Sequence, residues 1–415
     1  MKRFLTLTFA LLTALADPVF AGDVLTVGPT GGFATVSSAV SSASNGDTIL
    51  VGPGVTSISS IVVNQKSLSI VANQVEAIQV TGLIFVGHLL PGQTVLLAGL
   101  DLDSSYTPNF PSQPDCAVWL FLNKGSVRME NCRVTAAALV GVKIDQSDDV
   151  ALVDCEVSAP GPSDGAAIWA NGSFVALHGS VAQGPMGETP LQLFDLDGKP
   201  GGEALAITTS LVQASGCTFI GGVGGTGGAC SLGSTGDGGP GGIGVEVFSG
   251  TFRYRDCALV GGAGGQPGAS LPASCPDGSV GITGLALLTT SFTLAMPGVH
   301  RALNAPVPMR ELVPFPITLS GEPGELAGFI LSTATAYANV TPQSFPLLVS
   351  FNASAQLFLV GALPPSGAIT MNAAFPDLGI GVESVRLFMQ SIHLPAGGFL
   401  TFGAPTALVA VDSSF

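Results

Sequence analysis

Four polar residues stand at one position of a repeated segment, and together they could do acid–base chemistry. They are Asn131, Asp154, His178 and Asp256. If the repeats stack, these side chains form a column with neighbours about 5 Å apart, and an Asp beside a His can exchange protons with a substrate. The alternative is a solvated polar ladder on the outside of the molecule. Asp154 and His178 are therefore the first catalytic candidates, should the protein be an enzyme.

Two further pairs of acids could do chemistry. Asp148 and Asp149 fall in a Gln-Ser-Asp-Asp segment, expected to be a tight turn, and they join the catalytic candidates because paired carboxylates cleave glycosidic bonds. The run Phe194–Gly198 begins like a calcium loop but lacks a third acidic ligand and a closing Glu. Asp195 and Asp197 are the metal candidates, with an ordinary surface turn as the alternative. The sequence indicates no other cofactor.

Short strands of one repeat should position these residues. The pattern is apolar, any, apolar, any, polar, Cys, any, apolar, and its copies are VRMENCRV (127–134), VALVDCEV (150–157), FVALHGSV (174–181), VQASGCTF (212–219) and FRYRDCAL (252–259). Aligned on Cys132, Cys155, Gly179, Cys217 and Cys257, they are 23, 24, 38 and 40 residues apart. A strand that returns every 23 or 24 residues cannot bury its inner face alone, so the turns should stack into a solenoid.

The repeat predicts a long first domain and a short second one. Further strands are expected at 48–51, 68–72, 78–81, 95–102 and 118–122, which gives about nine to eleven turns up to Met296. Glycine-rich insertions should project from the corners between strands, as loop ornament or as the wall of a ligand groove. After residue 298 the repeat stops and proline becomes frequent, so we expect an antiparallel β-sandwich over 299–415.

Composition and the first residues limit the compartment and the partners. Charged residues are 10% of the chain and the formal net charge is −15, which disfavours binding to nucleic acid. Lys2 and Arg3, an apolar run to Ala16 and the small-residue context at Ala21 predict a signal peptide over 1–21, with cleavage after Ala16 as the alternative. No later run is long enough to span a membrane. We expect a secreted or cell-surface protein, with its oligomeric state open.

The seven cysteines divide into three groups. Cys132, Cys155, Cys217 and Cys257 share one repeat position, so they should stack as buried thiols, because parallel neighbours in register make poor disulfides. Cys230 and Cys275 lie in two glycine-rich insertions that can reach each other, and we predict a disulfide between them. Cys116 has no evident partner. Trp119 and Trp169 fall within strands, which favours core packing for both.

The segment VGPTGGFATVSSAVSSASNGDTILVGPG (27–54) resembles the first turn of the pectate-lyase-like right-handed parallel β-helix proteins. Val36, Ala39, Val40 and Ala43 fall at helical spacing and can close the end of the stack, as the capping helix of that family does. The resemblance implies an all-β chain with a right-handed parallel β-helix over 22–298. The whole layout is similar to sets of secreted β-helix proteins from planctomycete-type bacteria.

The catalytic motifs of this superfamily are incomplete in the chain. The pectinesterase segments do not occur, and of the polygalacturonase motifs only the Asp148-Asp149 pair is found. With 13 Lys plus Arg, the chain has few cations to bind an acidic polysaccharide or to act as a lyase base. The sequence therefore favours a non-catalytic secreted scaffold, structural, adhesive or facing polysaccharide or other cell-surface material. A divergent polysaccharide lyase or glycoside hydrolase is the alternative.

Overall fold

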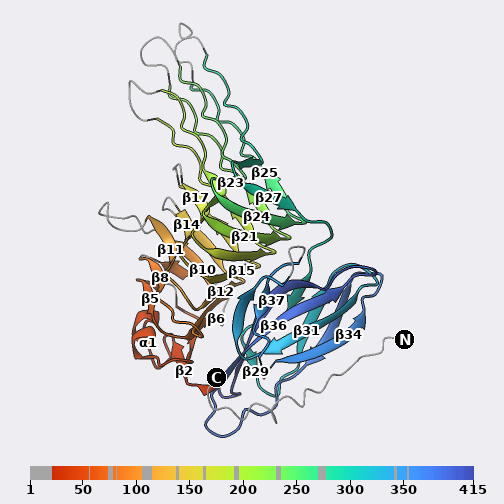
Figure 1. Cartoon of the computed structure of the whole chain (residues 1–415). Helices are drawn as coiled ribbons and strands as arrows, with labels where there is room; N and C mark the ends of the chain where they lie inside the picture. The colour runs from red at the N-terminus through yellow and green to blue at the C-terminus, as the bar shows by residue number, and fades with distance from the viewer. Residues whose placement is uncertain are drawn as a thin grey trace.

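The computed structural model describes residues 21–415, apart from 56, 73–77, 81, 105–114, 137–139, 162–164, 191–195, 230–234, 270–276, 341–343 and 353–354. Most of the described chain winds into a right-handed parallel β-helix, and its C-terminal part forms a second body of mainly antiparallel strands beside it (Figure 1). The predicted fold class is confirmed. Among the described residues, no helix has the length and apolar character needed to cross a membrane.

Three parallel sheets form the walls of the β-helix. Each complete turn from β3 to β26 contributes one strand to each sheet, and β2 and β27 extend sheet 1 by one strand at either end. Sheet 1 contains β2 (Val24–Val27), β3 (Thr48–Val51), β6 (Leu68–Ala72), β9 (Thr94–Ala98), β12 (Ser126–Glu130), β15 (Asp149–Val153), β18 (Phe174–His178), β21 (Ser210–Ser215), β24 (Gly250–Arg255) and β27 (Phe292–Ala295). Sheet 2 contains β4 (Ser57–Ile58), β7 (Ile78–Val80), β10 (Asp101–Ser104), β13 (Arg133–Ala136), β16 (Glu156–Ser158), β19 (Val181–Gln183), β22 (Thr218–Ile220) and β25 (Ala258–Val260). Sheet 3 contains β5 (Ile61–Asn64), β8 (Ile84–Gly87), β11 (Cys116–Phe121), β14 (Val140–Asp145), β17 (Ala166–Asn171), β20 (Glu203–Thr208), β23 (Val245–Val247) and β26 (Leu287–Thr289).

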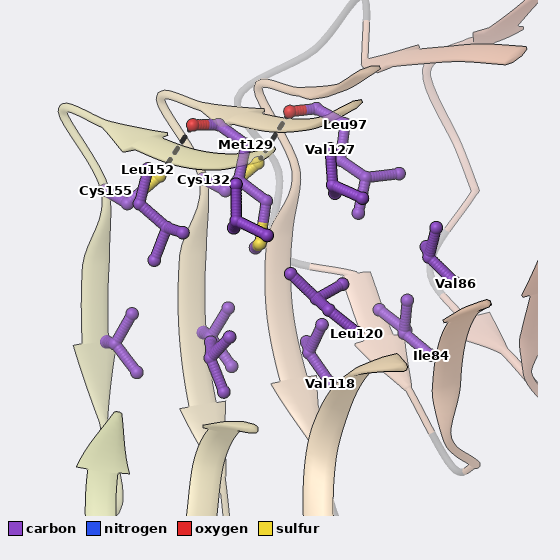
Figure 2. Close-up of a cluster of buried hydrophobic side chains, with 14 of the residues drawn as sticks. Ile84, Val86, Leu97, Val118, Leu120, Val127, Met129, Cys132, Leu152 and Cys155 are labelled. Carbon is purple, nitrogen blue, oxygen red and sulfur yellow. Dashed lines mark hydrogen bonds between the residues drawn. The ribbon is translucent and has the colours of Figure 1, made fainter. Parts of the chain in front are cut away.

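Alternating apolar side chains fill the interior of the stack. Val127 and Met129 of β12 point inward together with Val118 and Leu120 of β11, and all four are fully buried (Figure 2). Strands with this period of two present every second residue to the core, so each added turn buries its inner face on the turn below. Burial of such side chains, at roughly 25 cal/mol per Å² of apolar surface, stabilises the stack.

The cysteine position lies at the corner between sheets 1 and 2. Cys132, Cys155 and Cys217 are buried free thiols, and Cys257 is partly exposed. The thiol of Cys132 donates to the Leu97 carbonyl at 3.3 Å, and that of Cys155 to the Met129 carbonyl at 3.3 Å (Figure 2). These two thiols therefore each bond a carbonyl of the preceding turn, whereas the thiols of Cys217 and Cys257 bond the carbonyls of Ser215 and Arg255 within their own turns.

The residue before each corner cysteine adopts the left-handed backbone conformation. The φ angle is 50° at Asn131, 51° at Asp154, 58° at Gly179 and 51° at Asp256. Asn, Asp and Gly are the residues that tolerate this region best. The polar column is therefore explained by backbone geometry, and Gly179 belongs to it. The predicted alignment was one residue out at this turn, because Ser180 takes the cysteine position and donates its hydroxyl to the His178 carbonyl at 2.9 Å.

One short helix closes the first turn of the stack. α1 (Val36–Ser42) begins at Thr35, whose hydroxyl accepts a hydrogen bond from the Ser38 amide at 3.1 Å. This is the usual way of satisfying a free amide at a helix start. Val36, Ala39 and Val40 are buried against the first turns. The helix thus covers the end of the core that the first strands leave open.

The glycine-rich insertions between sheets 2 and 3 form an ordered spike rather than separate loops (Figure 1). The spike consists of two layers of extended segments, and its sequence repeats Gly-Gly-x triplets. The amide of the first glycine donates a hydrogen bond to a segment of the same layer, as the Gly224 amide does to the Ala263 carbonyl at 2.9 Å. The second donates to the opposite layer, as Gly225 does to the Lys199 carbonyl at 2.8 Å. The third residue, such as Thr226, faces solvent. The period of three is that of an extended polyproline-II-type chain.

The spike has two layers of extended segments, one formed by the first half of each insertion and the other by its second half. One layer consists of 184–190, 221–229 and 261–269, and the other of 196–202, 235–244 and 277–286. The segments pack so closely that the added Cβ of an alanine would overlap a neighbouring carbonyl at most of the glycines. The glycine content of the insertions therefore follows from close backbone packing, as it does in collagen.

The C-terminal body is a sandwich of two sheets. Sheet 4 contains β29 (Met309–Arg310), β37 (Thr401–Val411), β36 (Ser384–Leu394), β31 (Leu326–Ser332) and β34 (Gln356–Ala362), with β1 (Ala21–Gly22) paired to β36. Sheet 5 contains β28 (Ala302–Asn304), β30 (Phe315–Ser320) and β35 (Ala368–Ala373), and β32 (Thr335–Ala338) pairs with β33 (Leu347–Val349). Ile317 and Leu319 of sheet 5 pack against Phe329 and Met389 of sheet 4.

The other face of sheet 4 packs on the outer face of sheet 1. Leu50, Val71 and Leu96 of the β-helix form one cluster with Phe388 and Val409 of the sandwich. Because sheet 4 has an apolar cluster on each face, β36 and β37 are buried along almost their whole length. The outer face of sheet 1 is thus an internal interface, while the outer faces of sheets 2 and 3 lie away from the sandwich (Figure 1).

Candidate functional site

Polar side chains on the outer face of sheet 1 are used to hold the sandwich. The Glu130 carboxylate accepts hydrogen bonds from the Ala407 amide at 2.8 Å and from the Thr406 hydroxyl at 3.2 Å. Burial raises the pKa of Glu130 to about 7. From the other side, the Arg386 guanidinium donates to the Thr94 carbonyl at 3.2 Å. These contacts hold the two bodies together and use the side chains of Glu130 and Arg386 as structural groups.

The Asp148-Asp149 pair is split between two surroundings. Asp149, the first residue of β15, is buried and lies 2.7 Å from a guanidinium nitrogen of Arg128. Arg128 also donates to the Leu348 carbonyl of the sandwich at 3.1 Å. Asp148 stands half-exposed in the preceding turn and pairs with Lys124 at 3.1 Å. The two carboxylates therefore have separate structural partners and do not form an acid–base pair.

His178 and Asp154 are not stacked in one column. His178 lies in register with Val153, not with Asp154, and the link between the two residues is the Asp154 amide donating to the His178 carbonyl at 2.8 Å. The His178 ring is fully buried beneath Phe345, with 5.7 Å between ring centres, and its nitrogens have no hydrogen-bond partner among the described residues. Burial lowers the pKa of His178 well below 6.5.

The proposed metal and disulfide residues lie in the spike. Asp197 accepts a hydrogen bond from the Asp237 amide at 2.9 Å, which ties two neighbouring segments together. Asp195, Cys230 and Cys275 lie outside the described residues. In the part of the chain that the structure describes, no group of three or more His, Cys, Asp or Glu side chains is arranged to hold a metal ion. Calcium binding and the disulfide stay predictions.

The outer face of sheet 3 carries a row of aromatic and polar side chains. The row follows the strand register and consists of Val62, Phe85, Trp119, Lys143, Trp169, Ala206, Glu246 and Leu288. Both tryptophans of the chain are in it. Trp169 is 38% exposed and Trp119 is partly exposed. The prediction that they pack in the core is wrong, because their neighbours along each strand are the residues that point inward.

A hydrogen-bond network holds the polar part of this face. The Asp145 carboxylate accepts from the indole nitrogen of Trp119 at 2.9 Å and from the Asn171 amide at 3.2 Å. The Lys143 ammonium lies 3.7 Å from the same carboxylate and 5.2 Å from the centre of the Trp169 ring. Lys143 therefore stands between the two tryptophans, on the strand between theirs, and links them through Asp145.

The Trp119 ring has aromatic neighbours on two sides. Its centre lies 5.4 Å from that of Phe85, edge to face, and 4.6 Å from that of Phe121. His88 continues the cluster, with 5.5 Å between its ring and that of Phe121. Such contacts restrict the rings, and the hydrogen bond to Asp145 restricts Trp119 further. This part of the face is therefore organised before any ligand arrives.

A pair of carboxyl groups stands further along the same face. Glu203 and Glu246 come from the neighbouring strands β20 and β23. Burial raises the pKa of Glu246, and the interaction with the Glu203 side chain opposes this in part. In the strand register Ala206 lies between Trp169 and Glu246, and Glu203 lies three residues before Ala206 on β20.

The sequence contained a signal for this face. Val118 and Leu120 flank Trp119, and Ile168 and Ala170 flank Trp169, so inward apolar residues alternate with the tryptophans. A strand with this alternation points its middle residue outward. What the sequence did not show is that the sandwich covers the outer face of sheet 1 and leaves the outer face of sheet 3, with its aromatic and hydrogen-bonding side chains, exposed.

Comparisons with known proteins give no family and only distant structural matches. No family model matches the chain, and no curated protein matches it. The superoxide reductase (neelaredoxin) from Ignicoccus hospitalis aligns at 15% identity over 27% of this chain and 81% of its own, with a TM-score of 0.17. The enzymatically active domain of tailspike protein 2 of bacteriophage CBA120 aligns at 10% identity over 90% and 67%, with a TM-score of 0.27. The Dettilon tailspike protein gp208 aligns at 10% over 80% and 88%, also at 0.27. Scores this low carry no argument about function.

Proposed function

We propose that this protein is a non-catalytic β-helix scaffold of the pectate-lyase-like kind, exported to the cell exterior, that binds polysaccharide on the outer face of sheet 3. The observation that carries the proposal is the outward placement of Trp119 and Trp169, with Lys143, Asp145 and Asn171 between and beside them. Export rests on the predicted signal peptide.

The face has the two properties that sugar recognition needs. Aromatic rings present flat apolar surface to the C–H groups of a sugar ring, and fixed polar groups beside them accept and donate hydrogen bonds. Trp169 offers the more exposed ring, and Asn171 and Lys143 offer donors within the same row of strands. Because Asp145 already holds these side chains, little conformational entropy is lost when a ligand binds.

The arrangement of acids favours binding over hydrolysis. Glycosidases hold their two carboxyl groups about 5 Å apart or further, so that sugar or water fits between them. Glu203 and Glu246 lie on neighbouring strands of the tryptophan face and interact with each other, and we assign them to the binding surface. The sequence candidates Asp148, Asp149, Asp154 and His178 do not converge with this pair on any surface.

Affinity electrophoresis tests the proposal. The full chain, without its predicted signal segment, is run through gels that contain neutral or acidic polysaccharides, with and without Ca²⁺. We expect at least one polymer to retard it. Trp169→Ala should weaken retardation about 10-fold or more, since buried aromatic anchors dominate binding, whereas Trp169→Phe keeps most of the affinity.

The matched control is Phe351→Ala, which removes a 68% exposed aromatic ring from the C-terminal sandwich. It should leave retardation unchanged. Equal losses in the Trp169→Ala and Phe351→Ala variants would place the binding surface elsewhere. The same polymers are assayed for new reducing ends, because product release that Glu246→Gln abolishes would show that the protein is the enzyme of the alternative hypothesis.

A further inference from the structure

The two ends of the β-helix differ in how they are closed. At the first turn, α1 packs over β2, β3 and β5. At the last turn, β25, β26 and β27 end sheets 2, 3 and 1, and no strand among the described residues pairs with their outer edges. An open strand edge is a row of free backbone donors and acceptors and is a ready template for pairing. Here three such edges stand together.

The apolar core is also open at this end. Leu259 stands over Phe219, and Leu287 stands over Val245, one turn further along the stack. Phe219 and Val245 are buried, whereas Leu259 and Leu287 are partly exposed. The last strands also carry exposed apolar side chains on their outer sides: Val260 on sheet 2, Leu288 on sheet 3, and Phe292 and Leu294 on sheet 1. Exposed apolar groups beside an open core edge are typical of an interaction site.

The charge of the last turn is unusual for this protein. The chain carries a formal net charge of −15, yet residues 258–298 contain one charged side chain, Asp277. Two copies of an acidic protein repel each other over most of their surfaces. They can meet with least repulsion where both surfaces are uncharged, and the open end is such a surface.

We propose that the open end of the β-helix binds the same end of a second copy of this chain, forming a two-fold dimer. β27 stands one strand beyond β25 and β26 in the stack, so it is the edge that a partner meets first, and the same strand of another copy offers an edge of the same length. A two-fold contact of this kind uses one surface twice and closes on itself. A head-to-tail stack is disfavoured, because α1 covers the opposite end.

The two-fold axis brings β27 beside β27 of the partner in antiparallel pairing. With the axis at Thr293, Phe292 of one copy lies opposite Leu294 of the partner subunit, on the outer side of sheet 1. Both side chains are exposed in the single chain. Facing apolar pairs stabilise antiparallel strands, and the two symmetric pairs add to the backbone hydrogen bonds between the edges.

Sedimentation velocity over a range of concentrations tests the dimer. At high concentration, the sedimentation coefficient of the full chain without its predicted signal segment should correspond to the mass of two chains. Phe292→Asp places two unpaired carboxylates against apolar surface and should raise the dimer Kd about 100-fold. The control is Phe399→Asp, at a 75% exposed phenylalanine of the sandwich, which should leave the Kd unchanged.

Hydrogen exchange provides a second measurement on the unmodified protein. The amides of β27 should become more protected as the concentration rises through the Kd, while those of α1 should not change. A protein that stays monomeric throughout overturns the proposal. So does a dimer that is insensitive to Phe292→Asp, that responds equally to Phe399→Asp, or whose β27 amides exchange independently of concentration.

Discussion

The close packing of the spike leaves no space for a side chain at the second glycine of each triplet, and the Gly225→Ala variant tests this requirement. The Cβ of alanine would overlap the Glu188 carbonyl oxygen and lie 2.7 Å from its carbonyl carbon, both in the neighbouring segment of the same layer. Non-bonded carbon atoms prefer about 3.5 to 4.0 Å. The two segments must therefore separate by about 1 Å before an alanine fits.

That separation breaks hydrogen bonds on both sides of the position. The Gly225 amide donates to Lys199 at 2.8 Å, and the Lys199 amide donates to Glu188 at 3.0 Å. A further 1 Å takes both beyond hydrogen-bond range, at about 1 kcal/mol each. Steric overpacking destabilises the spike by about 2 kcal/mol more. Alanine also lowers the conformational entropy of the unfolded chain, which offsets somewhat less than 1 kcal/mol of this loss. We expect a net local loss of about 3 kcal/mol.

Because each turn contacts only its neighbours, this loss should open the spike without unfolding the β-helix body. Hydrogen exchange followed by mass spectrometry should show amides of 221–229 exchanging about 100-fold faster, with those of β12 and β15 unchanged. Thr226→Ala is the matched control, since Thr226 faces solvent. If Gly225→Ala and Thr226→Ala exchange alike, the close packing of the segments is refuted.

Two buried ionisable groups between the β-helix and the sandwich give predictions about pH. The pKa of Glu130 is raised to about 7, so its contribution to stability is present below pH 4.5 and is lost as the pH rises through 7, by about 3 kcal/mol. Glu130→Gln should therefore flatten urea-unfolding stability between about pH 5 and pH 8, and an unchanged slope would contradict this. The pKa of His178 is lowered by burial, so its contribution is present above pH 6.5 and is lost as the pH falls. His178→Leu should reduce the fall in thermal midpoint on acidification, and an equally steep fall would show that another group is responsible.

The sequence predicted the architecture well because the β-helix is local. Each turn packs on the next, so the alternation of Val127 and Met129 with polar neighbours specifies an inner face without long-range information. The error at Gly179 arose at a turn. The corner accepts Asn, Asp or Gly at its left-handed position, and the anchor was placed on that glycine instead of on Ser180. A single-residue slip then put His178 in the wrong column.

The repeat pattern could not predict the contacts between the β-helix and the sandwich. Leu96 and Val409 share one apolar cluster although they lie more than 300 residues apart in the chain. Nothing in a local pattern tells a face that will be covered from a face that will stay in water. His178 was therefore predicted as a catalytic candidate or part of a solvated ladder, although the sandwich buries it, and the exposed tryptophans of sheet 3 were predicted to pack in the core.

The requirement for glycine ends at the final segment of the second layer of the spike, 277–286. At Gly238, Gly241 and Gly244 a Cβ would meet carbonyl oxygens of the following turn. The corresponding residues of the final segment are Val280, Thr283 and Ala286, and no further turn follows them among the described residues.

The partner layer ends in a related way. Pro267 occupies the position of the donor Gly227 and has no N–H to offer. Proline removes a donor from an edge, and side chains prevent the close backbone packing that the spike segments use. β25, β26 and β27 contain no proline, and their side chains stand out of the plane of the strand ladder. This contrast directs the pairing of two copies to the end of the β-helix and away from the spike.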